Sequence, residues 1–387
     1  MNTRSFPRRT RRPISLERLD ARRVLAAFIW NTDSSGLWSD AANWQVVDGS
    51  SVTGIPASGD TVTIDRPNAD PVVTVASTTT VDEILTAETL AVEATLNVNR
   101  TLNVAKILRW TGGNLFTNGG ITIDPEGRFE ISGTPGQFTS NLTNEGTVDQ
   151  TATFRSGSRT ILIENLATGT WSTSIGLAGE AGNAVLFNNR GTFEKTGDED
   201  VEFKNSFDRF THFAGSEIIV RGGTMSLPTS ATQSETSTGA TFDVSPGATL
   251  NLLDGTGYYS GTYTGVGGGR VEISRGNFNS GFTPAVLDFP EGMLHWTGGT
   301  IVAGTQTIEN RGVMHWSGDG SRSLRGRLFQ NTGTIIHEDD GDSLLNSSGA
   351  GTFFENSVDG VFDLRDSGSL IGGTLTNFGR VQKSGQE

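Results

Sequence analysis

Short runs in which apolar and polar residues alternate recur along most of the chain. Residues 61–64 and 95–98 are examples, residues 217–220 form a similar β-prone run, and most of the residues that flank these runs are Asp, Asn, Ser or Arg. A period of two sends successive side chains to opposite faces of a strand, and most of the flanking residue types favour turns. The β-branched residues within the runs favour strands further. The pattern therefore predicts an all-β protein built from many short strands.

A longer unit repeats through this background: Asn, a short spacer, Gly, any residue, then a large apolar residue. Successive Asn residues are 21 and 24 residues apart in a first group, and 21, 25 and 21 apart in a second. A regular period of this length is typical of solenoids. We therefore predict a parallel β-helix (β-solenoid) with roughly 21–25 residues per coil. The copies lie at residues 144–148, 165–171, 189–193, 310–314, 331–335, 356–362 and 377–381, with degenerate copies at 239–242, 247–250 and 292–295.

The Asn and Gly of each copy are expected at a corner of the coil. Gly adopts positive φ without a steric penalty and Asn tolerates the left-handed region, so we expect that backbone conformation there. Asn side chains at equivalent corners can hydrogen-bond to the next coil, which predicts a ladder. The apolar residue after the Gly, such as Val148, Phe193 or Ile335, is expected to point into the core.

A second motif places Trp before a Gly-containing turn, at residues 110–113, 296–299 and 316–319. The pairs 295–296 and 315–316 are both His-Trp and lie 20 residues apart, close to one coil. We expect them to stack on adjacent coils as an aromatic ladder. A sugar-stacking platform and a histidine metal pair are alternatives, although no third metal ligand is evident.

Composition agrees with a repeat protein and limits its chemistry. Among 387 residues there are 51 Gly and only 34% hydrophobic residues, too few for a large layered α/β core. Cysteine is absent, which excludes disulfides, thiolate metal sites and a cysteine nucleophile. No apolar run is long enough for a transmembrane helix.

The net charge of −14 is unevenly distributed. Residues 1–23 contain eight Arg against Glu17 and Asp20, a net charge of +6, which leaves −20 on the rest of the chain. An acidic body repels phosphate backbones, so nucleic acid is not an expected partner. It also repels anionic polysaccharides unless a cation bridges the two.

Residues 1–27 are interpreted as an export leader. Their Arg-rich stretch precedes the short apolar patch 24–29, which is the order of regions in an export signal. Residues 16–27 resemble the leader of certain families of large bacterial surface proteins. The alternative is a basic helix or RNA-binding arm of a cytoplasmic protein.

Residues 28–65 are interpreted as an N-terminal cap. Trp38 and Trp44, with the turn at 54–56, suit a cover over the first coil, whose open strand edges would otherwise promote aggregation. Sugar stacking by these tryptophans is the alternative. This region resembles the start of exported bacterial β-solenoids, the class of autotransporter passengers and filamentous-haemagglutinin-like adhesins. The resemblance implies an extracellular location.

Residues 66–387 are expected to form the solenoid repeats. After the copy at 377–381 the sequence stops where another coil should continue. No pattern of alternating strands of about ten residues, typical of a C-terminal translocator barrel, is present, which departs from the autotransporter pattern. We expect either that the repeats continue in a longer protein or that the open last coil associates end to end with a second molecule.

No motif identifies a catalytic residue, a cofactor-binding residue or a metal ligand, so we predict no enzymatic activity, no cofactor and no metal. The acidic segments 197–200, 319–320 and 338–342 are interpreted as solvated turns, with weak calcium sites as the alternative. The Gly-rich segment 265–269 lacks the strand–helix context of a dinucleotide fingerprint and is interpreted as a loop.

The sequence therefore predicts a secreted, non-catalytic structural or adhesive scaffold of a bacterial surface, with a surface or matrix polysaccharide or protein as its partner. Parallel β-helices also host polysaccharide lyases and hydrolases, so a polysaccharide-active enzyme is the second interpretation. It would require strand-borne carboxylates clustered in a cleft. A carbohydrate-binding module that uses the tryptophans is the third.

Overall fold

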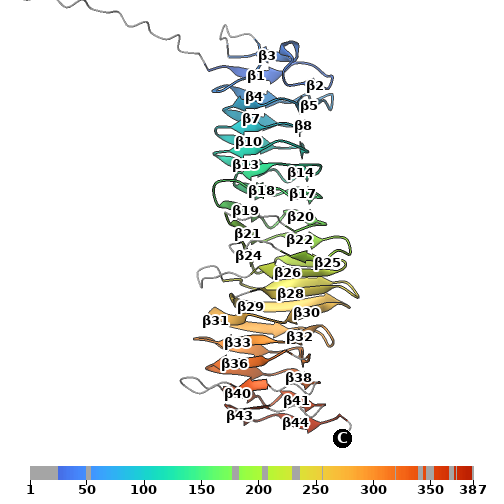
Figure 1. Ribbon diagram of the computed structural model, residues 1–387, viewed down its shortest axis with the longest axis vertical. Helices are drawn as coiled ribbons and strands as arrows, with labels where there is room; N and C mark the ends of the chain where they lie inside the picture. The colour runs from blue at the N-terminus through green and yellow to red at the C-terminus, as the bar shows by residue number, and fades with distance from the viewer. Residues whose placement is uncertain are drawn as a thin grey trace, which may run out of the picture.

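The computed structural model describes most of the chain as one long rod of stacked coils (Figure 1). Nearly all of the interpreted export leader, residues 1–24, lies outside the described residues. The described residues are 25–48, 54–176, 183–202, 208–228, 236–254, 256–318, 320–338, 343–345, 353–365, 370–371 and 373–385.

Each coil contributes short strands to as many as three faces of the rod. The first face consists of β1 (Ala27–Trp30), β4 (Thr61–Ile64), β7 (Glu83–Thr86), β10 (Thr101–Val104), β13 (Gly120–Ile123), β16 (Leu142–Asn144), β19 (Ile161–Asn165), β21 (Val185–Asn189) and β24 (Arg209–His212), with β3 (Trp44–Val46) at its end. The second face consists of β2 (Gly36–Leu37), β5 (Val72–Val75), β8 (Thr89–Val92), β11 (Ile107–Trp110), β14 (Arg128–Ile131), β17 (Thr147–Gln150), β20 (Thr170–Thr173), β22 (Thr192–Lys195), β25 (Glu217–Val220) and β27 (Ala240–Val244).

The third face is built in two parts. The first part consists of β6 (Thr79–Val81), β9 (Leu96–Val98), β12 (Leu115–Thr117), β15 (Gln137–Thr139) and β18 (Arg155–Ser156). The second consists of β23 (Val201–Glu202), β26 (Thr224–Pro228), β28 (Thr249–Asp254), β30 (Arg270–Ile273), β32 (Leu294–Trp296), β35 (Val313–Trp316), β38 (Thr334–His337), β41 (Val361–Leu364) and β44 (Arg380–Lys383).

Two long strands, β29 (Thr256–Gly267) and β31 (Asn277–Asp288), run from the first face onto the second. Gly265 to Gly267 therefore belong to a strand, and the interpretation of this segment as a loop is wrong at these residues. Beyond β31 the first face continues as β33 (Gly299–Ala303), β36 (Arg322–Gly326), β39 (Ser343–Leu345) and β42 (Leu370–Ile371). The second continues as β34 (Ile308–Asn310), β37 (Leu328–Asn331), β40 (Phe353–Asn356) and β43 (Thr374–Asn377).

The strands pair in parallel from coil to coil, which confirms the predicted all-β parallel β-solenoid. Paired residues are 17 positions apart between Thr79 and Leu96, and 27 apart between Thr334 and Val361, so the spread is wider than the predicted 21–25. Most differences in coil length fall in the turns, but the pairing of β29 with β31 shifts between Tyr259 and Gly261, so three residues of that difference lie within the strands.

Alternating side chains of the strands fill one continuous core. Val148, Phe193 and Ile335 are fully buried, as predicted for the residue two places after the repeat Gly. Their strand neighbours Thr147, Thr192 and Thr334 are only partly buried and face outward. The pleat of the strand thus separates core from surface at every second residue.

Three tryptophans and an antiparallel strand cover the N-terminal end. β3 pairs antiparallel with β1, on the edge opposite β4. Trp44 packs edge-on against Trp30 at 5.0 Å and Trp38 at 4.8 Å between ring centroids, and its Nε1–H donates to the Trp38 carbonyl. All three rings are buried, which confirms cap packing for Trp38 and Trp44. The short 3₁₀ helix Ala41–Asn43 leads into β3.

The predicted asparagine ladder is present, in two separate parts. In the first ladder, Asn144 donates to Asn165 and Asn165 to Asn189, with Nδ2–Oδ1 distances of 2.7 and 2.8 Å. In the second ladder, which runs through Asn310, Asn331, Asn356 and Asn377, each of the three side-chain bonds is 2.8 Å. All but Asn377 are fully buried. Since a buried amide without partners is costly, these bonds stabilise the corners.

The predicted reason for the repeat glycines is wrong at the seven full copies and holds at the three degenerate ones. No repeat glycine of a full copy, such as Gly146 or Gly333, has positive φ, whereas Gly239, Gly247 and Gly292 of the degenerate copies have φ of 116°, 82° and 79°. No described non-Gly residue has positive φ. Instead, a Cβ atom on Gly333 would lie 2.1 Å from the carbonyl oxygen of Gly312, and one on Gly146 would lie 2.2 Å from that of Gly127. The corners need Gly because stacked backbones approach too closely for any side chain.

Candidate functional site

The tryptophans, the first candidates for sugar contact, are all inside the rod. Trp110, Trp171, Trp296 and Trp316 are fully buried, and the three cap tryptophans are at most 7% exposed. No tryptophan therefore offers a ring face to a sugar. This finding removes the sugar-stacking platform and the tryptophan-based carbohydrate module.

The two His-Trp pairs stack on adjacent coils, as predicted. His295 pairs in register with His315, with ring centroids 4.7 Å apart, and Trp296 meets Trp316 edge-on at 5.1 Å. Burial, with Arg270 and His315 nearby, lowers the pKa of His295 to about 4. The aromatic ladder therefore holds a neutral His295 at pH 7.

The histidine ring nitrogens face protein atoms. His295 Nε2 lies 3.0 Å from the Gly292 carbonyl, and His315 Nε2 accepts from the Gly292 N–H at 3.2 Å. His295 Nδ1 lies 3.2 Å from Ser317 Oγ, and His315 Nδ1 lies 3.1 Å from Glu338 Oε2. Within the described ranges, no group of three or more His, Cys, Asp or Glu side chains is arranged to hold a metal ion.

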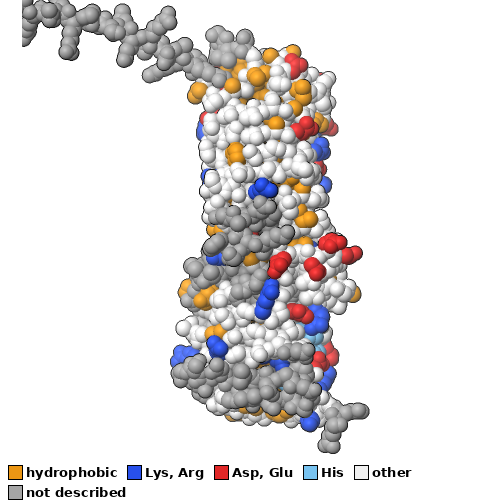
Figure 2. All heavy atoms as spheres, viewed as in Figure 1, with side chains coloured by type: hydrophobic (Ala, Val, Ile, Leu, Met, Phe, Trp, Pro, Cys, Tyr) orange, Lys and Arg blue, Asp and Glu red, His pale blue; other side chains and the backbone are white. Residues whose placement is uncertain are grey.

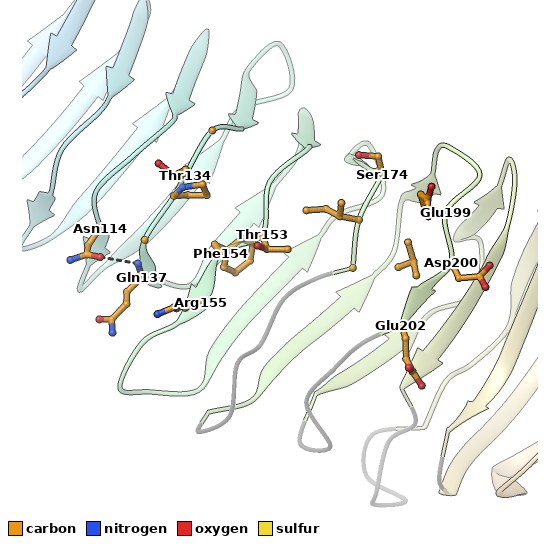
Figure 3. Close-up of a pocket in the computed structure, with 16 residues that line it drawn as sticks. Asn114, Thr134, Gln137, Thr153, Phe154, Arg155, Ser174, Glu199, Asp200 and Glu202 are labelled. Carbon is orange, nitrogen blue, oxygen red and sulfur yellow. Dashed lines mark hydrogen bonds between the residues drawn. The ribbon is translucent and has the colours of Figure 1, made fainter.

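A cleft opens where the third face is interrupted. The coil that carries β19 and β20 contributes no described strand to this face, so β18 and β23 are not paired with each other. The resulting cavity has a volume of about 850 Å³. Figure 3 shows the lining residues on both sides of the break, Asn114, Gln137 and Arg155 on one side and Glu199, Asp200 and Glu202 on the other. The break therefore makes a concave site on an otherwise regular face.

The wall of the cleft nearer the N-terminus is uncharged apart from one arginine. Asn114, Thr134, Gln137 and Thr153 contribute amides and hydroxyls, and Arg155 lies on β18. The backbone N–H of Gln137 donates to Asn114 Oδ1 at 2.8 Å, which fixes that amide (Figure 3). Behind this wall Phe154 is buried against Trp110 and Phe138, so the wall rests on the core.

The opposite wall is acidic. Glu199 and Asp200 lie in the turn before β23, and Glu202 lies on β23. Asp200 Oδ1 accepts from the Thr224 N–H at 2.6 Å, and Arg275 donates to Glu202 Oε1 at 3.2 Å. Figure 2 shows acidic side chains gathered on the surface near the level of β22 and β25. The two walls thus differ in charge.

A buried lysine fixes the acidic turn from below. Lys195 ends β22 and is fully buried, and its Nζ donates to the carbonyls of Gly197, at 2.8 Å, and Gly222. Burial lowers its pKa, while Asp200, Asp198 and Glu199 oppose that shift. Because a buried ammonium needs oxygen partners, Lys195 holds the turn close to the core. The sequence around Lys195 gives no signal of this role.

The turn at 197–200 is exposed, as interpreted, but two of its residues line the cleft. No sequence signal could have located the cleft, because it lies between β18 and β23, which no described strand connects. Of the other two acidic segments, residues 319 and 339–342 lie outside the described residues.

Family models, curated proteins and solved structures gave no match to this chain. The resemblance to exported bacterial β-solenoids therefore rests on the quoted residues and the fold. In the part of the chain that the structure describes, no helix has the length and apolar character needed to cross a membrane.

The cleft combines hydrogen-bond donors and acceptors with fixed carboxylates. Such a set can bind hydroxyl groups, which accept from amides and donate to carboxylates. Glu202 is a strand-borne carboxylate, which the enzyme interpretation requires, whereas Glu199 and Asp200 lie on a turn. The site is therefore suited to binding a polar chain.

Proposed function

We propose that this protein is a structural or adhesive scaffold of a bacterial cell surface, exported by its N-terminal leader and without catalytic activity. The observation that carries the proposal is the core, which is continuous from Trp30 to Phe362 along the rod. A rod of stacked coils keeps its flanks at fixed spacing, which suits the display of a binding surface.

Two features of the chain support an extracellular location. The Arg-rich residues 1–23 precede an apolar patch as in export signals, and residues 16–27 resemble leaders of bacterial surface proteins. The side-chain ladders and the capped first coil provide cross-links between coils in a chain without cysteine. The extracellular location is tested by adding protease to intact producing cells and measuring whether the full chain is digested.

The proposed role is tested by incubating the full chain with neutral and acidic polysaccharides, with and without calcium. Cleavage is followed by the appearance of new chain ends, and binding by co-sedimentation of the protein with insoluble polymer. Retention without cleavage is the expected result. Cleavage of any polymer contradicts the non-catalytic role, and absence of retention on every polymer contradicts adhesion to polysaccharide.

A polysaccharide-active enzyme is the second candidate, because Glu199, Asp200, Glu202 and Arg155 line one cleft. Acid–base cleavage needs carboxylates on both sides of the scissile bond, or a base beside a cation. If cleavage is seen, Glu199→Gln and Glu202→Gln should abolish it under this candidate, while Glu126→Gln, at an exposed turn, should not.

We also propose end-to-end association through the coil of β43 and β44. Leu375 and Val381 are 39% and 44% exposed there, whereas Phe354 and Phe362, with which they pair in the coil before, are buried. Phe378 at the corner between β43 and β44 is 62% exposed. Exposed apolar side chains beside open strand edges favour pairing with a further coil. Sedimentation of the full chain should show concentration-dependent association that Val381→Asp weakens, and a monomer at all concentrations contradicts it.

A further inference from the structure

We propose that the cleft between β18 and β23 binds a short stretch of an uncharged polysaccharide. The inference rests on the proposed adhesive role, and it adds the binding surface and the class of ligand.

The size and position of the cleft suit a chain-like ligand. Its volume of about 850 Å³ lies within the usual range of ligand pockets, about 300–1,000 Å³. It is bounded by strands of both parts of the third face, β18 on one side and β23 on the other. A ligand in it therefore contacts two rigid walls, and the walls need little reorganisation on binding.

The wall that carries Asn114, Thr134, Gln137 and Thr153 offers groups that both donate and accept. Sugar hydroxyls also do both, so either partner can supply the hydrogen. The Gln137 N–H donates to Asn114 Oδ1 and so orients this amide, and the two hydrogens on Asn114 Nδ2 therefore point in fixed directions. These features match a polyhydroxylated ligand.

The acidic wall supplies charged acceptors. Within the described residues, Asp200 and Glu202 each accept one hydrogen bond, through Oδ1 and Oε1, so the second oxygen of each is the one that we assign to a ligand hydroxyl. Glu199 has no hydrogen bond or ion pair with another described residue. Hydrogen bonds from hydroxyls to carboxylates are shorter and stronger than neutral ones. Among the described residues, these three carboxylates and Asp198 outnumber the nearby cations Arg155, Arg275 and Lys195, so the acidic wall keeps a negative charge that disfavours uronate or sulfate groups.

A protein partner fits the cleft less well. Protein interfaces are anchored by buried aromatic and large apolar side chains. Of the apolar side chains that line the cleft, Phe154 and Val201 are packed into the rod, and the smaller Pro135 and Ile175 are partly buried. The polar lining therefore favours a saccharide over a peptide.

Calorimetric titration of the full chain with soluble hexasaccharides tests the inference. The panel contains oligomers of glucose, mannose, xylose and N-acetylglucosamine, with oligogalacturonate as the charged comparison and a lysine-rich peptide as the protein comparison. We expect at least one neutral oligomer to bind at least tenfold more tightly than oligogalacturonate. Tighter binding of oligogalacturonate or of the peptide overturns the assignment.

Two pairs of variants localise the binding. Thr134→Trp places an indole at an exposed position of the cleft, and Ser39→Trp places one at an exposed position in the cap. Glu199→Gln removes a charge in the cleft, and Glu126→Gln removes one at another corner. We expect Thr134→Trp and Glu199→Gln to weaken binding of the neutral oligomer at least tenfold, and the two controls to leave it unchanged.

The outcomes separate this inference from the proposed function. If native protein and Thr134→Trp are retained equally on an insoluble neutral polymer, adhesion stands and the cleft assignment is wrong. If the native protein binds no polymer and no oligomer, both the adhesive role and the cleft assignment are wrong. Melting temperatures of all variants within a few degrees of the native protein show that the folded rod was compared.

Discussion

The two asparagine ladders share the same side-chain hydrogen bonds but lie at two different corners of the rod. The first ladder, from Asn144 to Asn189, ends strands of the first face, and the chain then enters the second face. The second ladder, from Asn310 to Asn377, ends strands of the second face, and the chain then enters the third. The same Asn–Gly motif thus occurs at either corner, where the backbones of stacked coils approach each other closely.

The region between the ladders explains the change of corner. Asn189 pairs in register with His212, and the next strands along the first face are the long β29 and β31. Because these strands run continuously onto the second face, that corner no longer has a tight turn. The ladder stops there and resumes at the next corner. The degenerate repeat copies fall in this interval.

The largest expected effect comes from a charge in the core of either region. Ile335→Asp in the region of the second ladder and Val148→Asp in the region of the first each place an unpaired carboxylate at a fully buried position. We expect each to lower the free energy of unfolding by about 4 kcal/mol or more, measured by urea denaturation.

Thr334→Asp is the control, because the Thr334 side chain faces outward. It should cost less than about 1 kcal/mol. Equal melting of Ile335→Asp and the native protein contradicts the register of β38.

Removal of a central ladder amide is the next largest effect. Asn331 accepts from Asn310 and donates to Asn356 and the Val361 carbonyl, and Asn165 makes the equivalent three bonds in the first ladder. We expect Asn331→Leu and Asn165→Leu to cost about 3 kcal/mol each, since both leave buried polar groups without partners. A large cost in only one ladder would mean that the two corners are not equivalent.

A methyl group at a repeat glycine distinguishes close approach from backbone strain. Gly333→Ala and Gly146→Ala introduce overlaps with backbone carbonyls and should each cost about 2 kcal/mol or more. Gly197, which has φ of +77° and nothing near its Cβ position, is the matched control for strain alone. Gly197→Ala should cost about 1 kcal/mol. The reverse order in thermal denaturation contradicts the explanation by close approach.

The smallest effect concerns His212, which occupies the position after the first ladder. Its ring is buried beside Phe242, Tyr259 and Tyr263, and burial lowers its pKa to about 3. The unfolded chain, with a pKa near 6.5, binds the proton more readily. Stability therefore falls as the pH drops below about 6.5 and levels off near 3, with a loss of roughly 2 kcal/mol at pH 5.

His212→Asn should remove this part of the pH dependence and place an amide in register with Asn189. The measurement is the free energy of unfolding at pH 7 and pH 5 for both proteins. An unchanged difference between the two pH values contradicts the assignment to His212.

Much of the fold could be predicted because the repeat is local. Val148 and Ile335 could be placed in the core from alternation alone, and the ladder followed from the spacing of Asn310 and Asn331. The close backbone approach at the glycines of the full copies could not be predicted, because it depends on the distance between coils. The change of corner could not be predicted either, because the Asn–Gly motif is the same whether it follows a strand of the first face or of the second.

The candidate site was less accessible to sequence analysis. Glu199 and Asp200 could be recognised as part of an exposed turn, but the position of the cleft depends on how the third face is divided between β18 and β23. Alternation places Lys195 on the inward face of its strand with Phe193, but only the fold shows that its ammonium group bonds to the carbonyls of the acidic turn. The partners of a buried charge leave no periodic signal.

Double-mutant cycles test most directly whether the rod holds two separate ladders of direct amide contacts. Asn310→Leu and Asn331→Leu, alone and together, measure coupling within the second ladder, and Asn165→Leu with Asn331→Leu measures coupling between the ladders. We predict a coupling free energy of about 1 kcal/mol or more within the ladder and additivity to within about 0.5 kcal/mol between ladders. Additive losses for Asn310 and Asn331 would contradict the account.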